Sequence, residues 1–256
     1  MEDASKSQRT AVVVLAAGKG TRMKGESSKV LSPLGGKPMV RYVLDAITAS
    51  GVCTAPVIVV GYKAEDVRAA VGEGYTYVHQ LVQLGTANAV EVTRDVLEGT
   101  VDQVIVLYGD HPCLTAHTIQ QLARVQRADC VVTLLTTVVE DFNDWRAPLY
   151  DFGRVIRDER GNILRVVEVT DLTEEQRAIR EVSLTMSCFR ADWLWGHLQQ
   201  LNTRNVQQEY YLADLVGLAV NEGSCVCALS IDPKESIGVN RPEHLQIAEK
   251  FLEERV

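Results

Sequence analysis

The sequence lacks long apolar runs and any excess of positive charge. None of its 256 residues belongs to an apolar run approaching the about 18 residues of a membrane-spanning helix, and the polar first ten residues contain no signal-peptide core. The net charge is −8, from 26 basic and 34 acidic residues. A nucleic-acid or anionic-membrane surface requires a basic face, so we expect neither partner. These absences predict a cytoplasmic protein and leave its oligomeric state open.

The sequence also lacks the paired cysteine spacings of metal-binding and disulfide-rich proteins. Its six cysteines, none in a CxxC pair, are Cys53, Cys113, Cys130, Cys188, Cys225 and Cys227. Most of them have apolar neighbours, which is typical of buried, reduced thiols. The spacing therefore predicts neither a zinc site nor a disulfide framework.

Two common phosphate-binding glycine motifs are missing as well. A Walker A loop, GxxxxGK[ST], is excluded because Val13 lies five positions before Gly18 and because Thr21 follows Gly20. The dinucleotide motif GxGxxG begins at Gly18 and Gly20, but Met23 occupies its third glycine position. Neither a P-loop nor a dinucleotide-binding protein is indicated.

What the sequence does contain is an apolar strand that runs into a basic, glycine-bracketed loop. Residues 12–15 form an unbroken aliphatic run, which is typical of a strand buried on both faces of a parallel sheet. Small residues then expose the main chain to a ligand, namely Ala16, Ala17, Gly18 and Gly20. Positive charge comes from Lys19, Arg22 and Lys29. The segment predicts a nucleoside-triphosphate site, although a strand and glycine turn also open α/β domains without one.

Strand and helix patterns alternate through the first half of the chain. Strands are predicted near 11–16, 56–61, 75–79, 103–108 and 130–137. Amphipathic helices are predicted near 38–50, 64–71, 86–98 and 115–127. This alternation is typical of βαβ units, so we predict an α/β fold with a doubly wound, mostly parallel, Rossmann-like sheet. Ligands bind such sheets at the carboxyl ends of the strands.

The pattern changes after about residue 141. A hairpin at 159–162 and a polar helix at 173–180 predict a small inserted β lobe. The remaining predicted elements are a strand at 182–189, helices at 191–200 and 209–221, a strand at 225–231 and a helix from 241. We predict that residues 1–256 form a single domain.

The basic loop resembles the signature LxxGxGTRM…PKxL of the sugar-1-phosphate nucleotidyltransferases. The matching residues are Leu15, Gly18, Gly20, Thr21, Arg22, Met23, Lys29 and Leu31. Ser28 stands where the family usually has proline. Within the family the sequence is most similar to the uridyltransferase domain of bacterial N-acetylglucosamine-1-phosphate uridyltransferases, over essentially the whole chain. The hexapeptide repeats of their second, acetyltransferase domain have no counterpart in this sequence.

Two residues match the metal-binding motifs of this family. Asp110 follows an apolar strand in the sequence Tyr-Gly-Asp, and Asn240 ends the sequence Gly-Val-Asn. Carboxylate and amide oxygens suit Mg²⁺, so the resemblance implies that this pair holds a magnesium ion. Each also has a structural alternative, because Asp110 precedes the helix beginning near Thr115 and Asn240 precedes the final helix. His111 is expected to support the metal ligands or to face outward.

The resemblance also implies which residues bind the nucleotide. A glutamine amide both donates to and accepts from a pyrimidine edge. The family pattern places Gln80, Gly85 and Thr86 on uracil and ribose, and leaves Gln83 unassigned. The other implied nucleotide contacts are Leu15, Ala16, Ala17, Gly18, Gly20, Thr21, Tyr108 and Gly109.

The sugar-binding positions of the family are matched less well. Gly153 and Glu168 correspond to the family's glycine and glutamate, whereas Ser183-Leu184-Thr185 replaces an Asn-Thr-Gly. Losing one hydrogen bond is worth about 1 to 3 kcal/mol, enough to change sugar preference about tenfold or more. Ser183 is therefore a predicted sugar contact, and the identity of the sugar stays open.

The resemblance implies transfer of UMP from UTP to a hexose-1-phosphate, N-acetylglucosamine-1-phosphate being the first candidate, with release of pyrophosphate. Arg22 and Lys29 are the implied catalytic residues, because this chemistry needs charge neutralisation rather than a protein nucleophile. Residues 1–140 are expected to bind mainly nucleotide, 141–240 mainly sugar phosphate, and 241–256 to form a C-terminal helix. One alternative is a uridylyl- or thymidylyltransferase for glucose-1-phosphate or another sugar, and another is a non-catalytic nucleotide-sugar binding protein. A glycosyltransferase is disfavoured because no DxD motif is present.

Overall fold

A central mixed sheet organises the chain. The computed structural model describes residues 8–20, 23, 27–126 and 129–255. The order across the nine-stranded sheet is β11-β7-β10-β6-β1-β4-β5, and β8 and β9 join it at β10. These strands are β1 (Thr10–Ala16), β4 (Val57–Val60), β5 (Thr76–His79), β6 (Gln103–Tyr108), β7 (Cys130–Val138), β8 (Gly153–Arg157), β9 (Ile163–Val167), β10 (Glu181–Arg190) and β11 (Cys225–Ser230).

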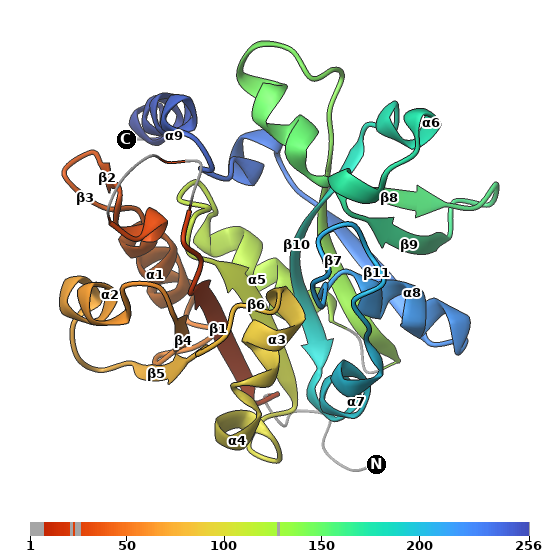
Figure 1. Cartoon of the computed structure of the whole chain (residues 1–256), viewed down its shortest axis with the longest axis horizontal. Coiled ribbons are helices and arrows are strands. Elements are labelled where there is room, and N and C mark those ends of the chain that lie inside the picture. Colours follow the sequence, from red (N-terminus) through yellow and green to blue (C-terminus); the bar gives the residue numbers. More distant parts are fainter. Residues whose placement is uncertain (1–7, 21–22, 24–26, 127–128, 256) are drawn as a thin grey trace.

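Helices cover both faces of this sheet (Figure 1). One face carries α1 (Met39–Ser50), α2 (Ala64–Val71) and α5 (Ala116–Val125). The opposite face carries α3 (Thr86–Glu91), α4 (Arg94–Leu97), α7 (Ala191–His197) and α8 (Asp214–Asn221). The uninterrupted apolar run of β1 follows from this layering, because Val12 packs against the first helix layer and Val13 against the second. The predicted doubly wound α/β fold is confirmed.

The remaining elements fall into two groups in chain order. The first group comprises the 3-10 helix η2 (Lys29–Leu31), the hairpin β2 (Pro33–Leu34) and β3 (Lys37–Pro38), the 3-10 helix η3 (Asp144–Asp151), and η4 (Val169–Asp171). The second comprises α6 (Glu174–Arg177), η5 (Leu198–Gln200), η6 (Pro233–Ser236) and α9 (Pro242–Glu253). A third apolar cluster joins α9 to η3 and the β2–β3 hairpin, through residues that include Phe251, Leu149 and Leu34.

Strand direction brings distant segments to one edge of the sheet. β1 pairs in parallel with β4 and β6, so the carboxyl ends of these strands meet, and Leu15 lies opposite Tyr108. β10 runs antiparallel between β6 and β7. Its amino-terminal half, which carries Ser183 and Thr185, therefore reaches the same edge as the carboxyl ends of its neighbours.

Three sequence-based boundaries differ from the structure. The helix predicted over 86–98 is divided into α3 and α4, and the helix predicted over 209–221 begins only at Asp214. The polar helix expected at 173–180 is the single turn α6, which Thr173 and Gln176 close with a capping box. The inserted β lobe is present as the β8–β9 hairpin, but it is hydrogen-bonded to the main sheet through β10.

The prediction for the cysteines is wrong for half of them. Cys113 and Cys188 are buried thiols, as expected. Cys130, Cys225 and Cys227, however, have sulfur atoms in direct contact at one place. The parallel pairing of β7 with β11 puts Cys225 opposite Cys130, a proximity that residues about 95 positions apart do not signal in the sequence.

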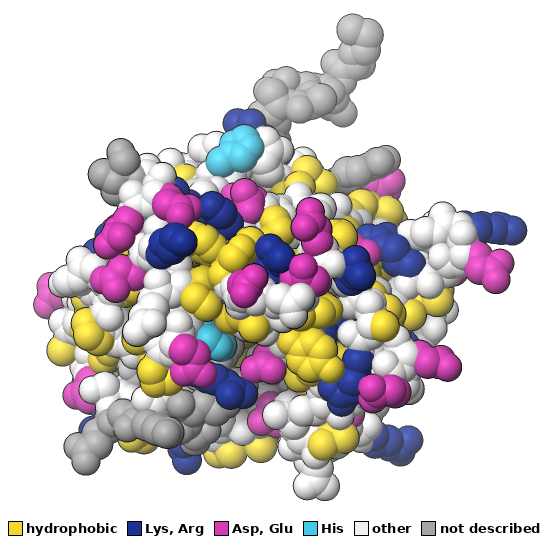
Figure 2. Space-filling model, turned by 90° about the horizontal axis from the view of Figure 1, so that it is seen from above, with side chains coloured by type: hydrophobic (Ala, Val, Ile, Leu, Met, Phe, Trp, Pro, Cys, Tyr) yellow, Lys and Arg dark blue, Asp and Glu magenta, His cyan; other side chains and the backbone are white. Residues whose placement is uncertain are grey.

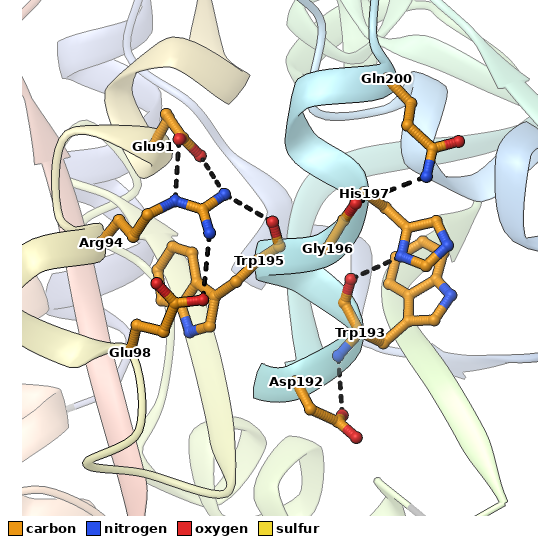
Figure 3. A network of polar contacts seen from close by, with 9 residues as sticks. All are labelled: Glu91, Arg94, Glu98, Asp192, Trp193, Trp195, Gly196, His197 and Gln200. Carbon is orange, nitrogen blue, oxygen red and sulfur yellow. Dashed lines mark hydrogen bonds and ion pairs between the residues drawn. The ribbon is translucent and has the colours of Figure 1, made fainter.

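A polar network joins α3, α4 and α7 on one face of the sheet. Figure 3 shows Arg94 of α4 forming a fork with Glu91, with Nε to Oε1 at 2.9 Å and Nη2 to Oε2 at 3.0 Å. Arg94 also donates to Glu98 at 3.1 Å and to the carbonyl of Trp195 in α7. This one guanidinium therefore fixes α4 against α7 within the second helix layer.

The surface matches the charge of the sequence. Figure 2 shows acidic and basic side chains interspersed over the face that it displays, with no broad basic area among the coloured residues. Within the described part of the chain, no helix combines the length and apolar character needed to cross a bilayer.

Candidate active site

A cavity of about 380 Å³ opens at the carboxyl edge of the sheet, a size suited to a small-molecule ligand. It brings together most of the predicted site residues. The predicted residues in its lining are Leu15, Ala16, Ala17, Gly18, Lys29, Gln80, Gly85, Thr86, Tyr108, Asp110, Gly153, Glu168 and Asn240. Gly20, Gly109 and Ser183 are not in the lining, and Thr21 and Arg22 lie outside the described residues.

One lysine connects the two predicted metal ligands. Lys29 Nζ donates to Asp110 Oδ2 and, at 2.9 Å, to Asn240 Oδ1. The other carboxylate oxygen, Asp110 Oδ1, is buried and accepts no hydrogen bond within the described part of the chain. An orphaned carboxylate oxygen beside an amide oxygen, at a point that already holds a cationic group, fits a hard divalent ion.

The backbone explains why Asp110 and Asn240 meet. The Val239 N–H donates to the Asp110 carbonyl at 2.9 Å, which ties the segment before α9 to the end of β6. The capping alternatives do not hold. Thr115, not Asp110, caps α5, because its Oγ1 accepts from Thr118 N at 3.1 Å. The N-cap position of α9 belongs to Arg241 rather than Asn240.

The electrostatics of this corner depend on burial. Burial favours the neutral carboxyl of Asp110, but the charge and hydrogen bond of Lys29 prevail and hold its pKa below the usual value. His111 is also buried, with Nε2 3.8 Å from Asp110 Oδ1, and burial lowers its pKa. Of the two alternatives expected for His111, the outward-facing one is wrong: its ring lines the cavity and packs edge-on against Phe152 at 5.7 Å.

The glycine loop serves Lys29 as well as the ligand. Gly20 has a φ of 61°, and a Cβ there would lie 2.5 Å from Lys29 Cβ. A larger residue at this position would displace the lysine from Asp110. At Gly18, by contrast, an added Cβ would meet nothing within 4 Å, so that stretch of main chain faces open space in the cavity.

Gln80 is fixed in one orientation. It is 3% exposed, and its Nε2 donates to the Gly85 carbonyl at 3.1 Å and to Asn88 Oδ1 at 2.9 Å. Both amide hydrogens are thereby used, which leaves Oε1 as an acceptor. Gly85 has a φ of 113°, and a Cβ there would lie 2.5 Å from the Tyr210 carbonyl, so this turn requires glycine.

The far end of the cavity carries a protonatable carboxyl. Burial raises the pKa of Glu168 to about 7, and the nearby carboxyls of Asp214 and Asp171 act in the same direction. Thr185 Oγ1 donates to Glu168 Oε1 at 3.4 Å. Burial also raises the pKa of the Tyr108 hydroxyl, which lines the cavity together with Thr86 and Thr185. This end therefore presents hydroxyl and carboxyl groups, the chemistry that recognises a polyol.

Thr185 lines the cavity, whereas the predicted sugar contact Ser183 does not. Ser183 is 1% exposed, and its Oγ accepts from the Thr185 N–H at 3.1 Å. Thr185 is in the left-handed region with a φ of 57°, which is unfavourable for a β-branched residue, and its side chain lines the cavity. Ser183 thus supports the conformation of Thr185, and Thr185 is the residue that faces the cavity.

Sequence reasoning missed the loop before α8. Gln207, Glu209 and Tyr211 line the cavity, in a segment that the sequence assigns partly to a helix. The polar and aromatic run Gln-Gln-Glu-Tyr-Tyr at 207–211 is the sequence feature that could have indicated this loop. Asp151 and Phe152 also join the lining. Their segment is held by the fully buried guanidinium of Arg154, which donates to the Phe152 carbonyl.

Solved structures share this fold. A UDP-glucose pyrophosphorylase in complex with UDP-glucose has a TM-score of 0.75, with 15% identity over 98% of this chain and 100% of the other. A nucleotidyl transferase from Methanothermobacter has a TM-score of 0.66, with 20% identity over 97% of this chain and 100% of the other. At these identities the likeness concerns the fold.

Sequence relatives extend the likeness over most of the chain. The bifunctional protein GlmU of Brevibacillus brevis is 40% identical over 246 residues, covering 95% of this chain and 52% of the relative. The GlmU of Heliobacterium modesticaldum is 38% identical over 251 residues, with coverages of 97% and 53%. The chain spans about half the length of the curated relatives it matches. The family model described as the MobA-like NTP transferase domain matches residues 12–179, which is most of the chain. The chain therefore belongs to this nucleotidyltransferase family.

Proposed function

We propose that the protein transfers UMP from UTP to N-acetylglucosamine-1-phosphate, giving the UDP-sugar and pyrophosphate. The observation that carries the proposal is the convergence of Lys29, Asp110 and Asn240 in the cavity that Gly18 of the glycine loop also lines. Such a cluster stabilises negative charge on phosphates during an in-line displacement. The sequence relatives named GlmU and the UDP-glucose pyrophosphorylase of similar fold support the same class of reaction.

The nucleotide is assigned to the side of the cavity built from residues 1–140. The main chain from Leu15 to Gly18 faces open space that suits the base, ribose and phosphates. Gln80 Oε1 is an acceptor, and uracil carries an N–H donor at N3 where cytosine carries an acceptor. The fixed amide of Gln80 therefore favours UTP over CTP.

Asp110 and Asn240 are the residues that would hold Mg²⁺. The ion, when bound, supplies charge neutralisation at the phosphates. Lys29 is then free to contact a phosphate oxygen, and Arg22 of the same loop is proposed as the second cationic contact. A phosphate monoester is ionised near neutral pH, so no protein nucleophile or general base is required. Since both substrates are charged metabolites, we also propose a cytoplasmic location.

The sugar phosphate is assigned to the side built from residues 141–240, and the C-terminal helix α9 (Pro242–Glu253) follows it. Glu168 and Thr185 present oxygen atoms to the sugar hydroxyls. Gly153 allows the β8 chain to lie close to β9, because a Cβ there would be 3.0 Å from the Val167 carbonyl. Ser183 contributes indirectly, through its hydrogen bond to the Thr185 N–H.

A second candidate, glucose-1-phosphate as acceptor, is favoured by Thr185. Its side chain occupies the sugar end of the cavity, where a glycine would leave more room for an N-acetyl group. Pyrophosphate release from UTP and Mg²⁺ tests both candidates, with N-acetylglucosamine-1-phosphate and glucose-1-phosphate compared in parallel. Release with the first supports the proposal, and release with glucose-1-phosphate alone replaces it by the second candidate. UTP binding without release by either would favour a nucleotide-sugar binding protein.

The variant Thr185→Gly measures the contribution of this residue to sugar choice. We expect the ratio of kcat/KM for N-acetylglucosamine-1-phosphate to that for glucose-1-phosphate to rise about tenfold, since one group in a pocket is worth about 1 to 3 kcal/mol. Thr86→Ser is a matched control, because it changes a hydroxyl residue that lines the proposed nucleotide side of the same cavity. An unchanged ratio in Thr185→Gly would remove Thr185 from sugar selection.

A further inference from the structure

Three cysteine sulfurs converge at the outer edge of the sheet. Cys130 begins β7, and Cys225 and Cys227 are the first and third residues of the edge strand β11. Cys130 Sγ lies against both other sulfurs, Cys225 Sγ and Cys227 Sγ are 3.9 Å apart, and all three lie within 4.8 Å of one another. In the described ranges, no other three side chains of His, Cys, Asp or Glu bring their ligand atoms this close together. None of the three lines the cavity.

The strand pairing produces this convergence. Cys225 is the register partner of Cys130, with their Cα atoms 4.4 Å apart. Residues two apart on a strand point to the same face, so Cys227 follows Cys225 on that face. The register of β7 and β11 shifts immediately after Cys225, and Cys130 reaches both neighbours, with its Cα 6.6 Å from that of Cys227.

We propose that Cys130, Cys225 and Cys227 form a three-thiolate site for a soft divalent cation such as Zn²⁺. A disulfide joins two sulfurs only, so it explains one pair and leaves the third sulfur without a role. Three convergent thiolates are the donor set that soft metal ions prefer. Zinc–sulfur bonds of about 2.3 Å give sulfur–sulfur separations of about 3.8 Å in tetrahedral geometry. The 3.9 Å between Cys225 and Cys227 matches this separation, whereas Cys130 Sγ lies closer to both sulfurs and has to move outward to admit the ion.

Burial divides the site into an inner and an outer part. Cys130 is 0% exposed and anchors the ion at the sheet, whereas Cys225 and Cys227 are partly open to solvent. The outer side gives the ion an entry path and leaves room for a water molecule as fourth ligand. Cys225 and Cys227 are 95 and 97 positions from Cys130 in sequence. A bound ion therefore ties β11 to the sheet, in which β11 pairs only with β7 among the described strands. Binding to the folded chain alone raises its stability.

A titration of the full chain with Cd²⁺ tests the site. The protein is first reduced with a phosphine, which removes any disulfide, and the sulfur-to-cadmium charge-transfer absorption is followed in the ultraviolet. We expect saturation at one ion per chain and a higher melting temperature with Cd²⁺ or Zn²⁺. Cys225→Ser and Cys227→Ser should each weaken binding at least about tenfold. Cys53→Ser, which removes a thiol outside the cluster, should bind as the wild type does.

Pyrophosphate release and circular dichroism of each variant establish that it is folded, since the cluster lies outside the cavity. Absence of stoichiometric Cd²⁺ binding by the reduced wild type would overturn the proposal. The proposal would also be overturned if folded Cys227→Ser bound Cd²⁺ with the affinity and the charge-transfer absorption of the wild type. If the reduced wild type binds no ion and mapping of the protein isolated without reductant finds a Cys130 disulfide, the cluster is a redox pair with a spare thiol and the metal site is rejected.

Discussion

Glu168→Gln should change how stability depends on pH. Glu168 follows β9 at the end of the cavity that we propose binds the sugar, where burial raises the pKa of its carboxyl to about 7, against an ordinary 4.5. The folded protein therefore keeps this proton up to about pH 7, whereas the unfolded chain releases it near pH 4.5. Glutamine has almost the same shape but never ionises, so it removes this proton linkage and little else.

The sign and size follow from the two pKa values. Below the unfolded value both states hold the proton, and above the folded value neither does. Between them the folded state alone holds it, so the wild type loses stability as the pH rises. The full difference corresponds to about 3 kcal/mol, most of which falls between about pH 5 and about pH 8. Glu168→Gln should thus gain about 2 to 3 kcal/mol over the wild type across this interval.

Urea unfolding of both proteins at about pH 5 and about pH 8 measures this difference. The free energy of unfolding, extrapolated to water, should show the variant close to the wild type at the lower pH and more stable at the higher pH. Asp214, whose pKa burial raises to about 6, acts on both proteins and largely cancels in the comparison. Glu65→Gln, on the exposed face of α2, controls for loss of one negative charge. A gap between Glu168→Gln and the wild type that does not widen with pH would refute the reasoning.

Three further substitutions test other parts of the site. Asp110→Asn should lower the rate of pyrophosphate release about 100- to 10,000-fold while circular dichroism stays native, and wild-type turnover would exclude a metal ligand at this position. Gln80→Ala should reduce the preference in kcat/KM for UTP over CTP about tenfold or more, and an unchanged ratio would show that its Oε1 does not read the base. Ser28→Pro should raise the free energy of unfolding by about 0.5 to 1 kcal/mol, because Ser28 has a φ of −60° and a buried Oγ without a partner in the described part of the chain. Destabilisation in urea would mean that the ring does not fit there.

The sequence by itself determined the layered fold and the end of the cavity that we propose binds phosphate. Its periodicity located the strands of the sheet, since β-branched runs such as residues 12–15 are stable only between two helix layers. Local motifs also marked Lys29, Asp110 and Asn240, because glycine turns and strand ends impose recognisable residue types. These features depend on short stretches of chain, and local composition is sufficient to reveal them.

Only the tertiary structure decided contacts between segments far apart in the chain. The antiparallel insertion of β10 brings Thr185 into the cavity lining and leaves Ser183 outside it. The hydrogen bonds from Gln80 to Gly85 and Asn88 select one orientation of an amide that the sequence leaves free. The pairing of β7 with β11 gathers three cysteines that the sequence scatters. Periodicity shows which residues form a strand, whereas the choice of neighbouring strand depends on how the whole chain packs, so these contacts have no local signature.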